Sequence, residues 1–146
     1  MKEGPGIFIA VTERDILLPD LIARIQNPLH GAQVVFCGTI RRLNGAKSVI
    51  GVSYDIFEPL AEKLFPEYSC EAQRQWGGQV VLVHRKGRVD VGKIAVVVLT
   101  STPHRNEAYE ASRYLIEKIK HHAPIWKKEH FEDGDSQWIQ GCALAE

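Results

Sequence analysis

Three lysines, Lys120, Lys127 and Lys128, stand close together in the sequence, on either side of an apolar turn that contains Pro124. Proline has no amide donor and disfavours a helical conformation for the residue before it, so we expect the preceding helix to end near residue 121 or 122. The apolar pair that follows the proline is expected to bury, while the ammonium groups stay in water or against anions. Such packing would fix the backbone of the lysines, as a catalytic or anion-binding lysine requires. The alternative is a helix end with solvated lysines.

Two further cations stand where a predicted strand passes to a predicted helix. His104 and Arg105 follow an apolar strand and precede a long amphipathic segment. A helix N-terminus presents unpaired amides and the positive end of the helix dipole, so the pair is a candidate phosphate or carboxylate site. The alternative is a capped helix start with an exposed arginine. The same dipeptide recurs as His84 and Arg85, but a glycine follows it and no helix does, so we interpret that pair as structural.

Arg41 and Arg42 form a third candidate position. They follow directly after an apolar strand predicted over residues 33–40, in which Gly38 indicates a bulge or a close approach by another backbone. Two arginines at the end of a buried strand could line a pocket, or they could form an ordinary solvated strand end.

The elements that must position these cations alternate between strands and helices. The apolar patterns predict strands over residues 7–11, 33–40, 49–57, 79–84, 93–101 and 137–139. Helices are predicted from Pro19 for about two turns, over residues 59–76, and from the His104 junction to the turn at Pro124.

Several packing relations follow from these patterns. Strand 33–40 is expected to be buried on both faces and to pair with strand 49–57 through a hairpin loop over residues 43–48. Strands 79–84 and 93–101 are expected at the centre of the sheet, because both are strongly apolar. Pro66 is expected to kink its helix or to divide it into two shorter helices.

Length and composition limit the class of protein. The chain has 146 residues, of which 45% are hydrophobic, so residues 1–146 are expected to form a single domain. Lysine plus arginine equals aspartate plus glutamate at 18 each, so no overall positive field favours nucleic acid or an anionic membrane. No apolar run is long enough to span a bilayer and no signal-peptide core is present, so a cytoplasmic location is expected.

The cysteines and the other possible ligands suggest no metal or redox centre. Cys37, Cys70 and Cys142 form no C-x-x-C pair, which argues against a disulfide framework, a zinc site or a redox dithiol. We expect each to be a free thiol, buried or incidental. No metal-ligand spacing and no glycine-rich phosphate loop occurs, so neither a metal nor a cofactor is expected.

Taken in order, five segments resemble the large, catalytic subunit of molybdopterin synthase: residues 36–41, 54–57, 83–87, 104–109 and 120–129. The last is the most specific, because Lys120, Pro124, Trp126 and the run Lys127-Lys128-Glu129 occur with an upstream His-Arg pair. The resemblance covers residues 32–140. It implies an α+β fold of the α/β-hammerhead type, with a mixed, mainly antiparallel sheet and packed helices.

The resemblance also implies a reaction and partners. Sulfur would pass from the C-terminal Gly-Gly thiocarboxylate of a small ubiquitin-like subunit to a pterin, cyclic pyranopterin monophosphate. The product is the dithiolene of molybdopterin, in molybdenum cofactor biosynthesis. The implied assembly is a homodimer of large subunits within a heterotetramer that has a small subunit at each end. Because the sulfur comes from the partner, the reaction agrees with cysteines that form no redox pair.

Carried over residue by residue, the resemblance implies a substrate site formed by Thr39, Ile40, Arg41, His104, Arg105, Lys120, Lys127, Lys128 and Glu129. A cyclic phosphate and an anionic thiocarboxylate need several fixed cations, so we expect His104 and Arg105 to form one anion pocket with Arg41. The partner's tail is expected to lie extended in a groove that ends at Lys120.

Lys120 and Lys127 are the implied catalytic residues. We assign Lys120 to the thiocarboxylate carbonyl, as polariser or transient acyl acceptor, and Lys127 to the pterin, as proton donor. Each ammonium group is expected to lower the pKa of the other by like-charge repulsion.

Two positions depart from the family pattern. Thr39 stands where many relatives have a lysine. Residues 141–146 contain no arginine, whereas some relatives lend a basic residue across the dimer from this tail. A function of another class remains open, namely a non-catalytic module that binds nucleotides or single-stranded nucleic acid through the same cations and exposed aromatics. The balanced charge argues against it.

Overall fold

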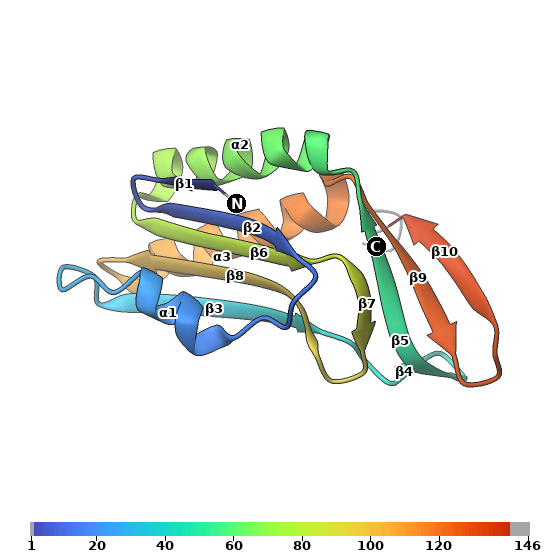
Figure 1. Cartoon of the computed structure of the whole chain (residues 1–146). Coiled ribbons are helices and arrows are strands. Elements are labelled where there is room, and N and C mark those ends of the chain that lie inside the picture. The colour runs from blue at the N-terminus through green and yellow to red at the C-terminus, as the bar shows by residue number, and fades with distance from the viewer. Residues whose placement is uncertain (1, 141–146) are drawn as a thin grey trace.

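The computed structural model describes residues 2–140, which fold into two β-sheets and three helices (Figure 1). The strands are β1 (Lys2–Gly4), β2 (Ile7–Thr12), β3 (Ala32–Thr39), β4 (Leu43–Asn44), β5 (Lys47–Ile56), β6 (Gln79–Arg85), β7 (Gly87–Asp90), β8 (Ile94–Thr102), β9 (Ile125–Phe131) and β10 (Ser136–Gln140). The helices are α1 (Leu18–Arg24), α2 (Glu58–Trp76) and α3 (Arg105–His122). The predicted α+β class is confirmed. Across residues 2–140, every helix is too short or too polar to cross a membrane.

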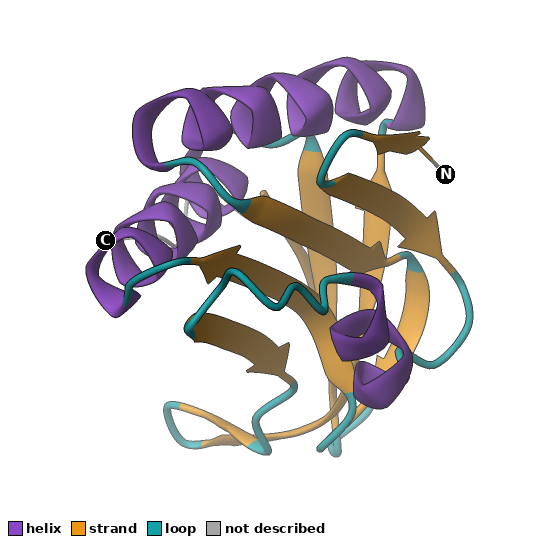
Figure 2. Cartoon of the chain, turned by 90° about the vertical axis from the view of Figure 1, so that its left-hand side faces the viewer, coloured by secondary structure: helices purple, strands orange, loops and turns teal. Residues whose placement is uncertain are grey.

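The first sheet has the strand order β1-β2-β6-β8-β3, in which only β2 and β6 run parallel. Helices α2 and α3 cover one face and α1 covers the other, as Figures 1 and 2 show. Successive side chains of a strand point to opposite faces, so Leu82 packs toward α2 and α3 while Val81 and Val83 pack toward α1. The predicted central position of the strands now labelled β6 and β8 is confirmed.

The second sheet has the order β10-β9-β5-β4, and β7 pairs with β5. It stands at one end of the first sheet, with its strands crossing the direction of β2, β6 and β8 (Figure 1). Val52, Val89 and Phe131 of this sheet share a core with Ile40 and Ala95 from the end of the first sheet. The two sheets therefore meet at the end of β3, where the candidate cations Arg41 and Arg42 begin.

Two expectations about strands were wrong. Among residues 2–140, strand β3 is an edge strand that pairs only with β8, and Val35 is 37% exposed, so β3 is not buried on both faces. Strand β5 pairs with β4, β7 and β9 in the second sheet, and not with β3. Strand β3 is nearly as apolar in sequence as the central strands, so local apolarity revealed neither its edge position nor the neighbours of β5.

Helix α2 is continuous from Glu58 to Trp76 although it contains Pro66, so the division into two helices was wrong. A proline in a helix interior costs about 3 kcal/mol. Full burial of one large apolar side chain contributes roughly 1.5–3 kcal/mol, and the stripe on this helix includes the buried Phe65 and Tyr68. The predicted apolar stripe is confirmed as core, and its packing offsets the lost hydrogen bond.

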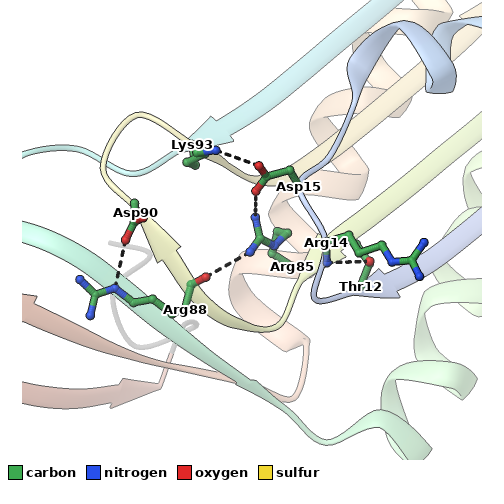
Figure 3. Close-up of polar contacts among 7 residues, drawn as sticks. All are labelled: Thr12, Arg14, Asp15, Arg85, Arg88, Asp90 and Lys93. Carbon is green, nitrogen blue, oxygen red and sulfur yellow. Dashed lines mark hydrogen bonds and ion pairs between the residues drawn. The ribbon is translucent and has the colours of Figure 1, made fainter.

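A polar cluster joins the loop after β2 to β6, β7 and β8 (Figure 3). The guanidinium of buried Arg85 donates through Nη1 to Oδ1 of Asp15 at 2.8 Å and through Nη2 to the carbonyl of Arg88 at 3.1 Å. Lys93 Nζ donates to the other oxygen of Asp15 at 2.8 Å. The structural interpretation of Arg85 is thus confirmed, because its side chain ties three segments together.

Candidate active site

A cavity of about 500 Å³ lies where the two sheets meet the C-terminal end of α3. The first sheet forms the floor of the cavity, and α3 forms one wall. The second sheet and the segment between β3 and β4 form the remaining walls. Its polar lining residues are Thr39, Arg41, Asn44, Tyr54, His84, Glu117, Lys120, His121, Lys127 and Glu129. Five of the residues implied by the resemblance are in this set: Thr39, Arg41, Lys120, Lys127 and Glu129.

The end of β3 is shaped by Gly38. The register with β8 shifts between Gly38 and Thr39, so the predicted bulge is present. A Cβ atom on Gly38 would lie 2.6 Å from Cγ1 of Val96, so the close neighbour of this glycine is a side chain and not another backbone. Only glycine allows this packing, which turns Thr39 and Arg41 toward the cavity.

Lys120 reaches the cavity from the last turn of α3, and Lys127 reaches it from β9. The helix ends at His122, directly before the turn at Pro124, as predicted. Ile125 anchors this turn as a buried residue, but Trp126 is 37% exposed, so only half of the expected apolar pair is buried. The turn nevertheless brings the two lysines to one cavity.

The pKa of each cavity lysine lies below its ordinary value. For Lys120, loss of hydration on burial is the main cause, and the charge of Arg41 adds to it. For Lys127, loss of hydration again leads, Glu129 opposes it, and the charges of Lys120 and Arg41 lower the pKa further. Both pKa values are lowered as predicted, but the cause was predicted incorrectly: desolvation leads in both, and the charge that acts on Lys120 is that of Arg41 and not that of Lys127.

Glu129 is a buried carboxylate held mainly by a neutral group. Both of its oxygens accept hydrogen bonds from Nδ2 of Asn44, at 2.9 and 3.1 Å, and Lys127 Nζ lies 3.9 Å from Oε1. Burial and the charge of Glu129 raise the pKa of Tyr54 to about 12. Asn44 and Tyr54 were not among the predicted site residues. Asn44 stands in the predicted hairpin loop, and Tyr54 was interpreted only as a strand residue although its segment contributes to the resemblance.

The remaining carboxylate of the lining also has partners. Glu117 accepts a hydrogen bond from Nε2 of His121 at 2.8 Å and lies 3.7 Å from Nε of Arg113. Within residues 2–140, Arg41 and Lys120 have no ion pair of their own. The cavity therefore presents cations whose neighbouring carboxylates are already engaged, which suits an anionic ligand.

The other implied site residues lie elsewhere in the single chain. Ile40 is buried in the core between the sheets and does not line the cavity. Lys128 points to the opposite face of β9 from Lys127, with Nζ 5.5 Å from the ring centroid of Trp138. Residues 141–146, whose lack of arginine was noted, fall outside the described part of the chain.

His104 and Arg105 lie at the N-terminal end of α3, and Lys120 lies at the other end. An α-helix rises about 1.5 Å per residue, so Arg105 and Lys120 are separated by roughly 22 Å along the axis. The expected pocket of His104, Arg105 and Arg41 is therefore not formed within one chain. The order of these residues along the sequence could not reveal their separation, because it does not show that α3 holds its two ends far apart in space.

Cysteines and possible metal ligands complete the description of the site. Cys37 is partly buried, which raises the pKa of its thiol, and Cys70 is exposed. Cys142 lies outside the described residues. Within residues 2–140, no group of histidine, cysteine, aspartate and glutamate side chains is gathered as a set of metal ligands.

Comparison with known proteins places this geometry in context. The family model described as "MoaE protein" matches residues 11–122. The molybdopterin synthase catalytic subunit of Halalkalibacterium halodurans is 41% identical over 131 residues, which cover 89% of this chain and 83% of that protein. The crystal structure of molybdopterin synthase from Staphylococcus aureus matches with a TM-score of 0.83 at 35% identity, over 88% of this chain and 94% of that one.

A more distant match concerns the fold alone. It is a chain from the protein–protein complex of subunits 1 and 2 of molybdopterin-converting factor of Helicobacter pylori, with a TM-score of 0.70 at 24% identity. The match covers 93% of this chain and 90% of that one. The overall fold is thus shared with a chain of low sequence identity.

Proposed function

The chain belongs to the MoaE protein family, and we propose that it is the catalytic subunit of a molybdopterin synthase that acts as a sulfurtransferase in the cytoplasm. Sulfur passes from the Gly-Gly thiocarboxylate of a small ubiquitin-like subunit to cyclic pyranopterin monophosphate. The observation that carries the proposal is the cavity in which Arg41, Lys120 and Lys127 converge while Glu117 and Glu129 are engaged by other groups. A phosphate and a thiocarboxylate are both anionic and both suit such a cavity.

Lys127 serves the pterin as a proton donor. Its side chain lines the cavity from β9 and is 24% exposed, and its lowered pKa makes proton transfer easier near neutral pH than from an ordinary lysine. Glu129 lies close enough to orient it, at 3.9 Å. The proton is needed when a C–O bond of the cyclic phosphate breaks as the C–S bond forms, and the freed phosphate oxygen leaves.

Lys120 serves the partner's thiocarboxylate. It stands at the mouth of the cavity, where an extended tail could reach it from outside, and its lowered pKa increases the fraction of neutral amine. In its charged form it polarises the thiocarboxylate carbonyl, and in its neutral form it can accept the acyl group transiently. Lys128 lies on the other face of β9 and has no part in this chemistry.

A second copy of the chain would bring His104 and Arg105 to the site. A groove of about 470 Å³ runs between β3 and α3 and reaches Lys120. Tyr109 and Val35 on this groove are 63% and 37% exposed. Exposed apolar groups along an open strand edge mark an interface, and a symmetric dimer uses the same patch on both copies.

Antiparallel packing of α3 against its symmetry mate would place opposite helix ends side by side. The midpoint between Arg105 and Lys120 falls between Ser112 and Arg113, which line the groove. A twofold axis at that midpoint would bring Arg105 of one copy next to Lys120 of the other. A homodimer of this geometry would unite the implied site residues that one chain keeps apart.

Reconstitution tests the reaction. The protein would be incubated with the thiocarboxylated small subunit and cyclic pyranopterin monophosphate, and formation of the dithiolene product would be followed. We expect product in the complete mixture and none when the small subunit lacks its last two residues. Oligonucleotide binding with a steep salt dependence and no dithiolene product would instead favour the non-catalytic module.

Mixing of two inactive variants tests the shared site. Arg105→Ala and Lys120→Ala are each expected to be nearly inactive alone. If the site is shared, a mixed dimer contains one site with both Arg105 and Lys120 intact, so mixing should restore about a quarter of full activity when chains pair at random. Two variants that stay inactive after subunit exchange would show that the residues act within one chain or not at all.

A further inference from the structure

His84 is a buried histidine on the floor of the cavity. It takes no part in the steps proposed for Lys120 and Lys127. Its residue is 4% exposed and it extends from β6 toward the space between α3 and β5. The ring contacts Tyr54 edge-on, with centroids 5.0 Å apart. A histidine packed this firmly presents its ring nitrogens in fixed directions.

The tautomer of His84 follows from its one hydrogen bond. Nδ1 lies 2.7 Å from the backbone carbonyl of Arg85. A carbonyl oxygen can only accept, so Nδ1 carries the proton. Burial and the charge of Lys120 hold the pKa of His84 at about 4, against the opposing effect of that hydrogen bond, so the ring is neutral at physiological pH. Nε2 therefore carries a lone pair.

This lone pair has no partner within residues 2–140. His84 and Lys120 line the same cavity and interact electrostatically, yet no hydrogen bond joins them. A ligand that occupies the cavity can therefore contact both side chains. Nε2 opens onto the cavity, so it is available to accept a hydrogen bond from a bound ligand.

Nε2 of His84 is a neutral hydrogen-bond acceptor, unlike the charged groups around it. The ammonium and guanidinium groups of the cavity can only donate, and Glu129 already accepts from Asn44 through both oxygens. Cations recognise the anionic part of a ligand but cannot recognise an N–H or O–H group. Neutral His84 can, without adding charge.

Resting on the proposed function, we propose that His84 is a substrate-binding residue whose Nε2 accepts a hydrogen bond from an N–H or O–H donor of the pterin. The cations hold the phosphate, and His84 orients the ring system relative to them. The residue thus selects for substrates that carry both an anionic group and a neutral donor.

Two matched substitutions separate this role from a purely structural one. In His84→Asn the side-chain amide can still donate to the Arg85 carbonyl, but no acceptor reaches the position of Nε2. In His84→Gln the amide oxygen can reach that position, while the short contact to Arg85 is given up. Both variants lose the ring contact with Tyr54, so that loss does not distinguish them.

We expect the dissociation constant of the pterin, measured by equilibrium titration without the small subunit, to rise about tenfold in His84→Asn and less in His84→Gln. The KM for the thiocarboxylated small subunit should stay unchanged in both, and melting curves would show that both variants fold. The reverse order of pterin affinities, or wild-type affinity in a folded His84→Asn variant, would overturn the proposal. Absence of turnover in the wild-type protein would count against the proposed function instead, since the titration does not depend on sulfur transfer.

Discussion

Two groups of basic side chains in this protein meet carboxylates in opposite ways. At one end of the first sheet, Arg85 and Lys93 each donate to an oxygen of Asp15 at 2.8 Å (Figure 3). In the cavity, the carboxylate of Glu129 is held by the neutral amide of Asn44, and Lys127 stays 3.9 Å away. The first group neutralises its own charge, whereas the second leaves its cations for a ligand.

The pKa directions express the same difference. The pKa of Asp15 is lowered, chiefly by its hydrogen bond and charge interaction with Lys93, so its ionised form is favoured in the fold. The pKa values of Lys120 and Lys127 are lowered by desolvation, so their charged forms are disfavoured in the fold. Paired cations stabilise the structure, and the cavity lysines oppose it until an anion arrives.

The largest expected effect comes from the cavity lysines themselves. Lys120→Met and Lys127→Met should each lower turnover by about 10²–10⁴-fold, the usual contribution of a positioned acid or base. Melting temperatures should equal or exceed that of the wild type, because the lowered lysine pKa values mean that charging these groups costs stability at neutral pH. Product formation and thermal melting would be measured together.

Lys128→Met is the matched control, since Lys128 lies on the opposite face of β9 beside Trp138. It should retain most of the activity. If Lys120 and Lys127 act as one unit, the double variant should lose little more than either single variant. Near-normal turnover in folded Lys120→Met would remove the role assigned to that lysine.

A carboxylate placed in the cavity should neutralise its cations, as Asp15 does for Arg85 and Lys93. Thr39 lines the cavity and is exposed, so Thr39→Asp should fold and give the cations an internal partner. We expect the affinity for the pterin to fall roughly 10–100-fold, which corresponds to about 1.5–3 kcal/mol for a charge-assisted contact. Thr39→Lys, which adds a further cation instead, should bind at least as tightly as the wild type. Equal affinity of the two variants would show that charge at this position does not matter.

Removal of the paired arginine should affect stability and leave chemistry unchanged. Arg85→Met loses charge-assisted hydrogen bonds in a buried setting, which amounts to about 2 kcal/mol and a fall of about 4–8 °C in melting temperature. Turnover at a temperature where both proteins are folded should match the wild type. Arg88→Met, which removes the exposed ion pair to Asp90, should change the melting temperature far less. A drop in turnover in folded Arg85→Met would contradict the division between the two groups.

The smallest expected effect concerns acid stability. Because the folded pKa of Asp15 lies below its ordinary value of 3.8, its contribution is present above that pH and is lost as the pH falls through the folded pKa. Asp15→Asn should therefore be less stable than the wild type at pH 7, with a difference that shrinks below about pH 3.8. Melting curves at several pH values would test this. A difference that stays constant down to pH 2 would mean that the charge of Asp15 contributes nothing.

Residues close in sequence were predicted more reliably than partners far apart in sequence. The end of α3, the bulge at Gly38 and the core stripe of α2 follow from proline, glycine and apolar spacing, and all are present. The pairing of β5 was wrong, and the position of His104 and Arg105 relative to Arg41 was wrong for a single chain. Those errors concern which segments meet in space, and no local pattern encodes that.

The same limit applied to the site. Lys120 and Lys127 were singled out from residue type and spacing, and Glu129 from the resemblance, and all three line the cavity. Asn44 and His84 were not singled out, because their roles depend on a carboxylate and a cavity that other segments supply. His84 was even set aside as structural together with Arg85, although the two side chains point to opposite faces of β6 and have different surroundings.

The sequence by itself determined the helices, most of the strands, the turn that carries the lysines and the resemblance to a family, since each depends on short-range sterics, apolar periodicity or residue identity. The tertiary structure alone decided which cations are neutralised and which stay available. Pairing of Arg85 with Asp15, and of Asn44 with Glu129, requires segments about 70 and 85 positions apart to pack together. Electrostatic character depends on those distances and on burial, so the same lysine or arginine supports the fold in one place and binds a ligand in another.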